Sequence, residues 1–568
     1  MKSNIPDKKS NDSSDFALGV MFVSFLCLVF FTMYHKAIVY LYQTNCEKLF
    51  YAVWLLVLFL IYRRLKNNLE NGKENRKSLL KLIALRGKPE RTPMYLNAQI
   101  QTRPTPPLST TRPTAASTHR LPSAPMPRGE IKIGTRLKDG HPVYLTDEKR
   151  TTHVQVLGAT GRGKTESVIL PWMVQDFAVK GSPVVLIDGK GDPELVRRFR
   201  EYAETPQNRD DIYVFDLMSK DSCAINPLKW GTPLQITDRI MSSFEFQDPY
   251  YKAVQSEGLL TIVTLIAKSR HGVTFKLIDR ALRDMEFLTE LNDDLSDTEF
   301  KLKVRAILNL KDSERMSQFS GLLSQISPFV NGEIAELVNG PLAGKRELSL
   351  SSVLSDQPWD PEAALILIPT LMYPEAGRVL GRMLLQEVAY SVGRLCVTGK
   401  ANKFASVFLD EFSSYAYPGF EQILNKARSA RVALHLSHQS TGDLESVSPE
   451  FAKIVNTNTN IKCLLGLNDP DTADFFARHM GTETSTKFTE RVEEKESFFG
   501  SKDERTGSKS MRETEAYKIH PNRLKNLNAG EGIIHVPGKP DAVTEEIQFF
   551  DLHSLGIAPK CTPAEKFR

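Results

Sequence analysis

The stretch from His153 to Leu170, HVQVLGATGRGKTESVIL, decides the fold of this 568-residue chain. It begins as an apolar strand, continues through a glycine-rich turn, and ends with apolar residues at helical spacing. Within it, Gly158, Gly163, Lys164 and Thr165 fit the pattern G-x-x-x-x-G-K-[ST]. A strand, a glycine turn and a helix in this order direct backbone amides and the positive end of the helix at an anion. The stretch therefore predicts a loop that binds the phosphates of a nucleoside triphosphate.

Each residue of this predicted phosphate loop has an expected contact. Lys164 would reach the terminal phosphates, and the hydroxyl group of Thr165 would bind Mg²⁺. ATP and Mg²⁺ are therefore the expected cofactors. The residues expected to surround the phosphates are Gly158, Ala159, Thr160, Gly161, Arg162, Gly163, Lys164 and Thr165.

A second motif, SVFLDEF, is predicted to be a buried strand that ends in Asp410 and Glu411. If this strand lies beside the phosphate loop, Asp410 would complete the Mg²⁺ shell and Glu411 would polarise the attacking water. An ordinary buried strand with a polar end is the alternative. The phosphate loop upstream makes catalysis the favoured interpretation.

The sequence VALHLSHQS predicts a further buried strand, with Gln439 at its tip. In ATPases with an extra strand between the phosphate loop and the acidic strand, a polar residue here contacts the terminal phosphate. His435 and His438 lack an acidic or cysteine partner at ligand spacing, so we interpret them as satisfied polar residues. Arg428 and Arg431 precede the strand, and each is either a helix-end cation or an arginine finger for a neighbouring subunit.

The order of elements predicts an α/β fold. Apolar strands alternate with helices, which favours a mostly parallel sheet covered on both faces. Residues 231–344 instead show helical periodicity and many charges, so we expect a helical insert there. The nucleotide-binding domain is then formed by 131–230 and 345–568. Within it, the charged stretch 484–515 is expected to be a solvated excursion, with EGIIHV as a final strand.

The N-terminal part of the chain is different in kind. Phe16–Tyr34 is a run of 19 residues without a formal charge, and Leu49–Tyr62 is a second apolar run of 14 residues. We expect a tail, 1–15, followed by two transmembrane helices within 16–63. A signal peptide is disfavoured because the first run is long, no small-residue cleavage site follows, and a second run comes soon after.

The distribution of charge predicts the orientation of these helices. Residues 63–128 hold 14 Lys and Arg against 3 Asp and Glu, so the positive-inside rule places both ends of the pair in the cytoplasm. We expect 64–130, which is first basic and then rich in proline, to be a linker. Because residues 1–62 contribute +1 and 63–128 contribute +11 to a total of +5, residues 129–568 carry −7. This large part is not a generic basic binder of nucleic acid.

Taken in order, these motifs resemble the coupling proteins of type IV secretion and conjugation. The likeness runs from Phe16 to about Pro537 and rests on the two apolar runs, GATGRGKT, LIDGKGD, INPL, the helical insert, FLDEF and HLSHQS. Members of this family are membrane-anchored, RecA-like, hexameric P-loop ATPases. They bring a relaxase-bound DNA strand to a secretion channel in the bacterial inner membrane.

The resemblance implies roles and partners. The implied partners are single-stranded DNA, relaxase and relaxosome proteins, subunits of the type IV secretion channel, the membrane and five further copies of the chain in a homo-hexamer. The turn from Asp188 to Asp192 is expected near the nucleotide. The implied site roles are phosphate binding for 158–165, Mg²⁺ for Thr165 and Asp410, water activation for Glu411, a phosphate sensor for Gln439 and the finger for Arg428.

The function implied by the resemblance is ATP-driven movement of a DNA strand, with its attached protein, toward a secretion channel. The alternative is a docking receptor for secreted protein substrates, in which ATP controls assembly only. A double-stranded chromosome pump is disfavoured because the sequence has no visible C-terminal winged-helix segment. The insert, 231–344, is expected to recognise the cargo, since it leaves and rejoins the sheet and can vary without disturbing the ATP site.

Overall fold

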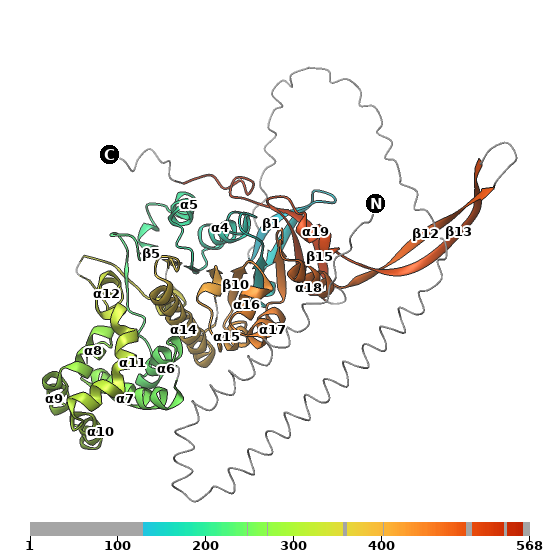
Figure 1. Cartoon of the computed structure of the whole chain (residues 1–568). Helices are drawn as coiled ribbons and strands as arrows, with labels where there is room; N and C mark the ends of the chain where they lie inside the picture. Colours follow the sequence, from blue (N-terminus) through green and yellow to red (C-terminus); the bar gives the residue numbers. More distant parts are fainter. Residues whose placement is uncertain are drawn as a thin grey trace, which may run out of the picture. The chain divides into compact units, whose positions relative to one another are not determined.

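The computed structural model describes most of the chain beyond its N-terminal quarter (Figure 1). The tail, the two expected transmembrane helices and nearly all of the expected linker lie outside the described residues. Within the described part, no helix combines the length and the apolar character needed to cross a bilayer. The described residues are 129–560, except 247, 270, 343, 356–360, 402, 496–501 and 539–541.

An eleven-stranded sheet forms the centre of the described part, in the order β2-β1-β15-β14-β11-β3-β10-β9-β4-β8-β5 (Figure 1). From β11 to β5 the neighbouring strands run parallel. From β2 to β11 each neighbouring pair is antiparallel. The strands are β1 (Glu130–Arg136), β2 (Pro142–Thr146), β3 (Val154–Leu157), β4 (Val184–Asp188), β5 (Ile212–Asp216), β8 (Ala363–Leu367), β9 (Ala405–Asp410), β10 (Val432–His438), β11 (Ile461–Leu464), β14 (Glu531–Val536) and β15 (Val543–Phe549).

The mostly parallel sheet confirms the predicted α/β class, and the structure corrects one detail and adds another. EGIIHV forms β14 but is not the final strand, because β15 follows it and pairs with it. The described residues of 484–515, for which only a solvated excursion was expected, form the paired strands β12 (Thr482–Lys495) and β13 (Lys502–Tyr517). The hairpin is rich in Thr, Ser and charged residues, so its sequence lacks the apolar alternation that marks a half-buried strand.

Both faces of the sheet are covered, because alternate residues of its central strands enter two different cores. In β4, Val185 and Ile187 pack with α14, whereas Val184 and Leu186 pack with α4 and α5. This alternation is the period-two pattern of a strand with two buried faces. The helices outside the insert are α3 (Asp147–Arg150), α4 (Leu170–Val174), α5 (Pro193–Ala203), α13 (Leu350–Val353), α14 (Pro374–Thr398), α15 (Glu421–Ala427), α16 (Thr441–Glu445), α17 (Pro449–Asn458), α18 (Pro470–Met480) and α19 (Pro521–Lys525).

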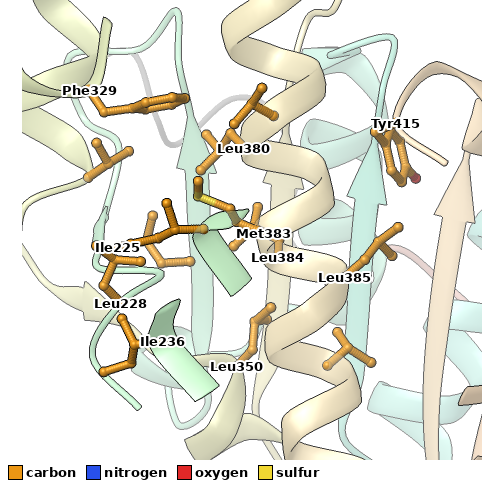
Figure 2. Packing of buried hydrophobic residues seen from close by; sticks show 14 of the residues in the cluster. Ile225, Leu228, Ile236, Phe329, Leu350, Leu380, Met383, Leu384, Leu385 and Tyr415 are labelled. Atoms are coloured by element: carbon orange, nitrogen blue, oxygen red, sulfur yellow. The ribbon is translucent and has the colours of Figure 1, made fainter. Parts of the chain in front are cut away.

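Between two short strands the chain forms only helices within the described residues. β6 (Ala224–Ile225) and β7 (Glu347–Leu348) pair in parallel at the points where the chain leaves the sheet domain and returns to it. Ile236 of α6, Phe329 of α11 and Met383 of α14 belong to one hydrophobic cluster, so the helices share a core with the sheet domain (Figure 2). These helices are α6 (Pro233–Ser243), α7 (Pro249–Lys268), α8 (Phe275–Arg283), α9 (Met285–Asp293), α10 (Thr298–Leu308), α11 (Asp312–Val330) and α12 (Glu333–Leu337).

A buried cation lies beside the strand that leads into the phosphate loop. Lys462 of β11 is fully buried and pairs in register with Gln155 of β3. Its ammonium donates to Gln155 Oε1 (2.7 Å), to the carbonyl of Asn456 (2.7 Å) and to Thr459 Oγ1 (2.9 Å). These three acceptors are neutral, so they do not offset the loss of water, and burial lowers the pKa of Lys462 to about 7.

The buried lysine predicts a pH-dependent stability. Because the pKa of Lys462 is about 7 in the folded protein and the ordinary pKa of a lysine is 10.5, the unfolded chain binds more protons between these limits. The wild type should therefore gain stability relative to Lys462→Met as the pH rises, by up to ~1.4 kcal/mol per pH unit. Urea unfolding from pH 7 to pH 10 measures this difference. The exposed Lys453, substituted in the same way, is the control, and parallel pH profiles for wild type and Lys462→Met would contradict the prediction.

Candidate active site

The phosphate loop leaves β3 at Leu157 and ends at Thr165, where a helix begins with a π-helical turn. Gly161 and Gly163 have φ angles of 77° and 88°, in the region that favours glycine. At Gly158, a Cβ atom would come within 3.0 Å of the Leu465 side chain. The loop is therefore a cradle that these glycines keep open, as a phosphate-binding loop requires.

Lys164 is folded back into this cradle. The lysine is buried, and its ammonium donates a 2.7 Å hydrogen bond to the carbonyl of Gly158. A carbonyl is a neutral acceptor, so an anionic phosphate oxygen would bind the same ammonium more strongly. The residues present therefore fit a bound triphosphate, with Lys164 as its cation.

Two oxygen ligands of the kind that Mg²⁺ prefers meet at the end of the loop. The Thr165 hydroxyl donates a 3.0 Å hydrogen bond to Oδ2 of Asp410, the last residue of β9. The other carboxylate oxygen of Asp410 accepts from Ser437 Oγ at 2.7 Å and from the amide of Glu411 at 3.0 Å. Asp410 is thus oriented by its neighbours while it faces the loop, as a Mg²⁺ site requires.

Gln439 connects the loop to Glu411. Its side-chain oxygen accepts from Thr160 Oγ1 at 3.1 Å, and its Nε2 lies 3.5 and 3.4 Å from the two carboxylate oxygens of Glu411. Glu411 has a φ of 46°, a strained conformation for a residue with a side chain. Ser414 holds it there, since its amide and hydroxyl both donate to the Glu411 carbonyl, at 3.0 and 2.8 Å.

The turn after β4, which the resemblance placed near the nucleotide, lies next to these residues. Asp188 pairs in register with Asp410, and its carboxylate accepts from the amides of Lys190 (2.8 Å) and Asp192 (2.7 Å). Burial, and then the nearby Asp410 carboxylate, raise the pKa of Asp188 to about 7. The edge therefore concentrates acidic groups where a divalent cation would relieve their repulsion.

The structure does not bring Arg428 to this site within one chain. Arg428 precedes β10 and lies near His153, which precedes β3, whereas the phosphate loop follows β3. Because β3 and β10 are parallel, Arg428 is at the opposite edge of the sheet. Arg428 and Arg431 are both exposed. Neither can act on the phosphate loop of its own subunit, so the finger role requires a second subunit.

Both histidines of β10 are satisfied, as predicted. His435 Nε2 lies 3.0 Å from Arg150 Nη2, and its Nδ1 lies 3.1 Å from the Val407 carbonyl. His438 contacts Gln155 Nε2 at 2.8 Å and the Ser440 carbonyl at 2.7 Å. Burial lowers the pKa of both rings, so they stay neutral at pH 7.

Sequence reasoning missed two features of the site. Ser437 orients Asp410, and only the register of β10 against β9 could have indicated it, since Leu436 faces Leu409. Arg162 donates to the carbonyl of Leu527 at 3.3 Å, so a C-terminal segment covers part of the loop. That contact joins residues 365 positions apart, for which no local pattern exists.

Comparisons with known proteins find several that this chain resembles. A family model described as the TraM recognition site of TraD and TraG matches residues 405–529. The type 4 coupling protein DotL of Legionella pneumophila is 22% identical over 416 residues, which cover 63% of this chain and 53% of DotL. The chain thus spans about half the length of this curated relative.

Solved structures with a similar fold include several of the plasmid coupling protein TrwB. An unbound form of TrwBΔN70 has a TM-score of 0.54 at 15% identity, over 76% of this chain and 91% of that chain. TrwB in complex with ADP and Mg²⁺ has a TM-score of 0.51 at 16% identity, over 73% and 89%. This likeness shows that the chain has the RecA-like α/β fold with a large, mostly parallel sheet.

The role of Ser437 can be tested by its removal. Ser437→Ala should raise the Mg²⁺ concentration that gives half-maximal binding of a fluorescent ATP analogue by about tenfold, because Asp410 loses the donor that orients it. Ser406→Ala is the matched control, since Ser406 is also buried and its hydroxyl has no hydrogen-bond partner in the described part of the chain. Equal Mg²⁺ requirements in the two variants would contradict the assignment.

Proposed function

Because the chain belongs to the type IV coupling protein family, we propose that it is an ATPase that couples relaxase-bound single-stranded DNA to a secretion channel and drives its translocation. The observation that carries this proposal is the contact between Thr165 and Asp410, with Gln439 lying between Thr160 and Glu411. This arrangement places oxygen ligands, a carboxylate and an amide around one phosphate loop.

Each residue of the candidate site has a separate role in ATP hydrolysis. Lys164 and the loop amides bind the phosphates, and Thr165 and Asp410 hold Mg²⁺. Bound Mg²⁺ supplies charge neutralisation on the phosphate oxygens. Glu411 accepts a hydrogen bond from the attacking water and orients it. Gln439, which directly follows β10, acts as the sensor of the terminal phosphate.

Support for a DNA and relaxosome role comes from the relatives. TrwB is a conjugative coupling protein, and its structures include complexes with ADP and Mg²⁺ and with the ATP analogue ADPNP. The match to a TraM recognition site covers 405–529, which begins with β9. We propose that this region contacts relaxosome proteins while the site above hydrolyses ATP.

The decisive experiment measures ATP turnover of the full-length protein with and without single-stranded DNA. We expect DNA to stimulate hydrolysis, and Lys164→Ala to abolish both turnover and DNA transfer while the protein still inserts in the membrane. Turnover that DNA leaves unchanged would favour the docking receptor, in which ATP controls assembly only. DNA transfer by Lys164→Ala would mean that this loop does not supply the energy.

Arg428 is proposed to complete the site of a neighbouring subunit. Its position at the far edge of the sheet excludes action in its own subunit, and its exposed guanidinium can reach across a subunit boundary. A subunit arrangement that places this edge against the next phosphate loop is head-to-tail, which closes into a ring such as a homo-hexamer. Arg431, three residues later, is the competing assignment.

The finger can be tested by mixing subunits. Arg428→Ala should slow hydrolysis by about 10³-fold or more while ATP affinity stays near that of the wild type, because the finger contacts charge that develops only during phosphoryl transfer. Mixed Arg428→Ala and Lys164→Ala subunits should recover part of the turnover, since one interface then has both residues. Arg431→Ala is the control, and a dead Arg431→Ala with a normal Arg428→Ala would reverse the assignment.

The protein is proposed to be a multi-pass protein of the bacterial inner membrane, with its ATPase domain in the cytoplasm. The apolar runs within 16–63 and the basic block that follows them support this topology. A reporter fused after Arg64 should be active as a cytoplasmic fusion, and one inserted within 40–46 as an external fusion. The opposite pattern would refute the topology.

A further inference from the structure

A chain of buried hydrogen bonds leads from Lys462 to the backbone beside Gln439. The ammonium of Lys462 donates to the side-chain oxygen of Gln155 at 2.7 Å. The amide nitrogen of Gln155 lies 2.8 Å from Nε2 of His438, and Nδ1 of His438 lies 2.7 Å from the carbonyl oxygen of Ser440. The first three side chains are fully buried. The chain therefore joins β11, β3 and β10 to the residue that follows the proposed phosphate sensor.

The neighbours of Gln155 fix which way its amide group faces. Its oxygen accepts from Lys462 and also from Thr459 Oγ1 at 3.2 Å. Its nitrogen donates to Oδ1 of Asn456 at 2.7 Å and faces His438. Lysine donates to an oxygen whether or not it carries its third proton, so this orientation does not depend on the charge of Lys462.

The orientation of Gln155 determines which ring nitrogen of His438 carries the proton. An N–H group of Gln155 points at Nε2, so Nε2 accepts and the proton of the neutral ring is on Nδ1. Nδ1–H then donates to the carbonyl of Ser440. The other tautomer would oppose two N–H groups at Nε2 and two lone pairs at Nδ1. Lys462 thus fixes the tautomer of His438 through Gln155.

The hydrogen bond from His438 restrains the backbone that carries the sensor. Asp443 accepts from the amides of Gln439 (2.8 Å) and Ser440 (2.9 Å). His438 holds the carbonyl of Ser440, so two different side chains fix the turn. The side chain of Gln439 reaches Glu411 only at 3.4 and 3.5 Å, and a small rotation of the turn would separate them.

We propose that Lys462, Gln155 and His438 are positioning residues that hold Gln439 toward the terminal phosphate, an inference that rests on the proposed function. They act through the carbonyl of Ser440, and not by contact with the nucleotide. Loss of the chain should lower kcat and the preference for ADPNP over ADP. The affinity for ADP should stay near that of the wild type, because ADP lacks the phosphate that Gln439 senses. Buried polar networks also stabilise folds, so the test separates the two roles.

The first test compares two substitutions of His438 in the full-length protein. The amide of asparagine replaces Nδ1 and keeps a donor for Ser440, whereas the amide of glutamine lies nearer to the position of Nε2. Relative to His438→Asn, His438→Gln should have about tenfold lower kcat and about tenfold less preference for ADPNP over ADP. Urea unfolding shows that both variants are folded. Equal kcat and equal preference in the two variants would overturn the proposal.

His435 supplies the matched control pair. It is buried on the same strand, and its ring also lies between a nitrogen donor, of Arg150, and a backbone carbonyl, of Val407. It has no bond to the turn that carries Gln439. His435→Asn and His435→Gln should therefore have the same preference for ADPNP over ADP. A difference between them as large as that between the His438 variants would show that the effect is not specific to the chain.

The second test uses Gln155→Glu, which keeps the shape of the side chain but cannot donate to Nε2. A carboxylate there raises the pKa of His438 and draws a proton to Nε2. At low pH the ring carries both protons and keeps its bond to Ser440. As the pH rises, the neutral ring keeps the Nε2 proton and loses the Nδ1 proton. The ratio of kcat for Gln155→Glu to kcat for the wild type should therefore fall about tenfold between about pH 6 and pH 9.

Other titrations are removed by the ratio and by a second background. The charged groups that act on the pKa of His438 are Asp443 of α16, Lys462 of β11 and Lys164 of the phosphate loop. All three are present in both proteins. With His438→Asn in both, the ratio should not change with pH, because an amide does not titrate. A ratio independent of pH in the presence of His438, or the same slope in both backgrounds, would overturn the proposal.

The role of Lys462 is tested by a double-mutant cycle. Lys462→Met removes the donor that orients Gln155, so it should lower the preference for ADPNP about threefold when His438 is present. In the His438→Asn background it should have no effect, since asparagine donates to Ser440 however Gln155 is oriented. An equal effect in both backgrounds would show that Lys462 acts on stability alone.

The proposed function is judged by a separate measurement. All of these comparisons are made without DNA, and the binding of ADPNP and ADP requires no hydrolysis. Turnover that single-stranded DNA does not stimulate would refute the proposed function and leave the comparison of the His438 variants valid. Stimulated turnover together with equal nucleotide preference in His438→Asn and His438→Gln would refute the positioning chain alone.

Discussion

The insertion of β10 between β3 and β9 is the constraint on which the site depends. Parallel pairing on both sides of β10 brings the ends of the three strands to one edge of the sheet. Thr165 follows β3, Asp410 ends β9, and Gln439 follows β10, so this strand order alone makes the three side chains neighbours. A shift of β10 by one residue would turn Ser437 away from Asp410 and into the opposite core.

Carboxylates repel one another at this edge of the sheet, and the packing of the rest of the fold offsets that repulsion. Asp188 and Asp410 face each other in register, and Glu411 adds a third carboxyl group in a strained conformation. Such a cluster persists because the two apolar cores on either side of the sheet hold the strands in place. Bound Mg²⁺ would offset the repulsion between these carboxylates. At a strand end with no ligand, the repulsion and the strained backbone would only lower the stability of the fold.

The shared core connects the helical insert to the sheet that carries the candidate site. Residues of α6, α11 and α14 belong to one hydrophobic cluster, so the insert helices pack directly against the sheet domain (Figure 2). Through Gly189 and Thr370, the loop before α14 also bonds to the strand that ends in Asp410. Packed elements move in discrete steps rather than deforming continuously, so a change at the phosphates has a route to the insert.

The sequence by itself determined the local parts of the site. Gly158–Thr165 is a contiguous pattern whose glycines and helix start are set by backbone geometry, and the apolar strands ending in Asp410 or Gln439 are visible as short runs. The parallel class followed from the alternation of such strands with helices. These features depend on neighbours a few residues away, which is why the sequence alone shows them.

The tertiary structure decided which of these parts meet. The contact of Thr165 with Asp410 spans 245 positions, and the orientation of Asp410 by Ser437 depends on the register of one strand pair. The position of Arg428 at the opposite edge also follows from strand direction, which no residue pattern near it encodes. The antiparallel pairing at the other end of the sheet, and its strands β1, β2 and β15, were missed for the same reason. Long-range pairing is selected by the packing of the whole core, because each local segment could pair in several ways with similar free energy.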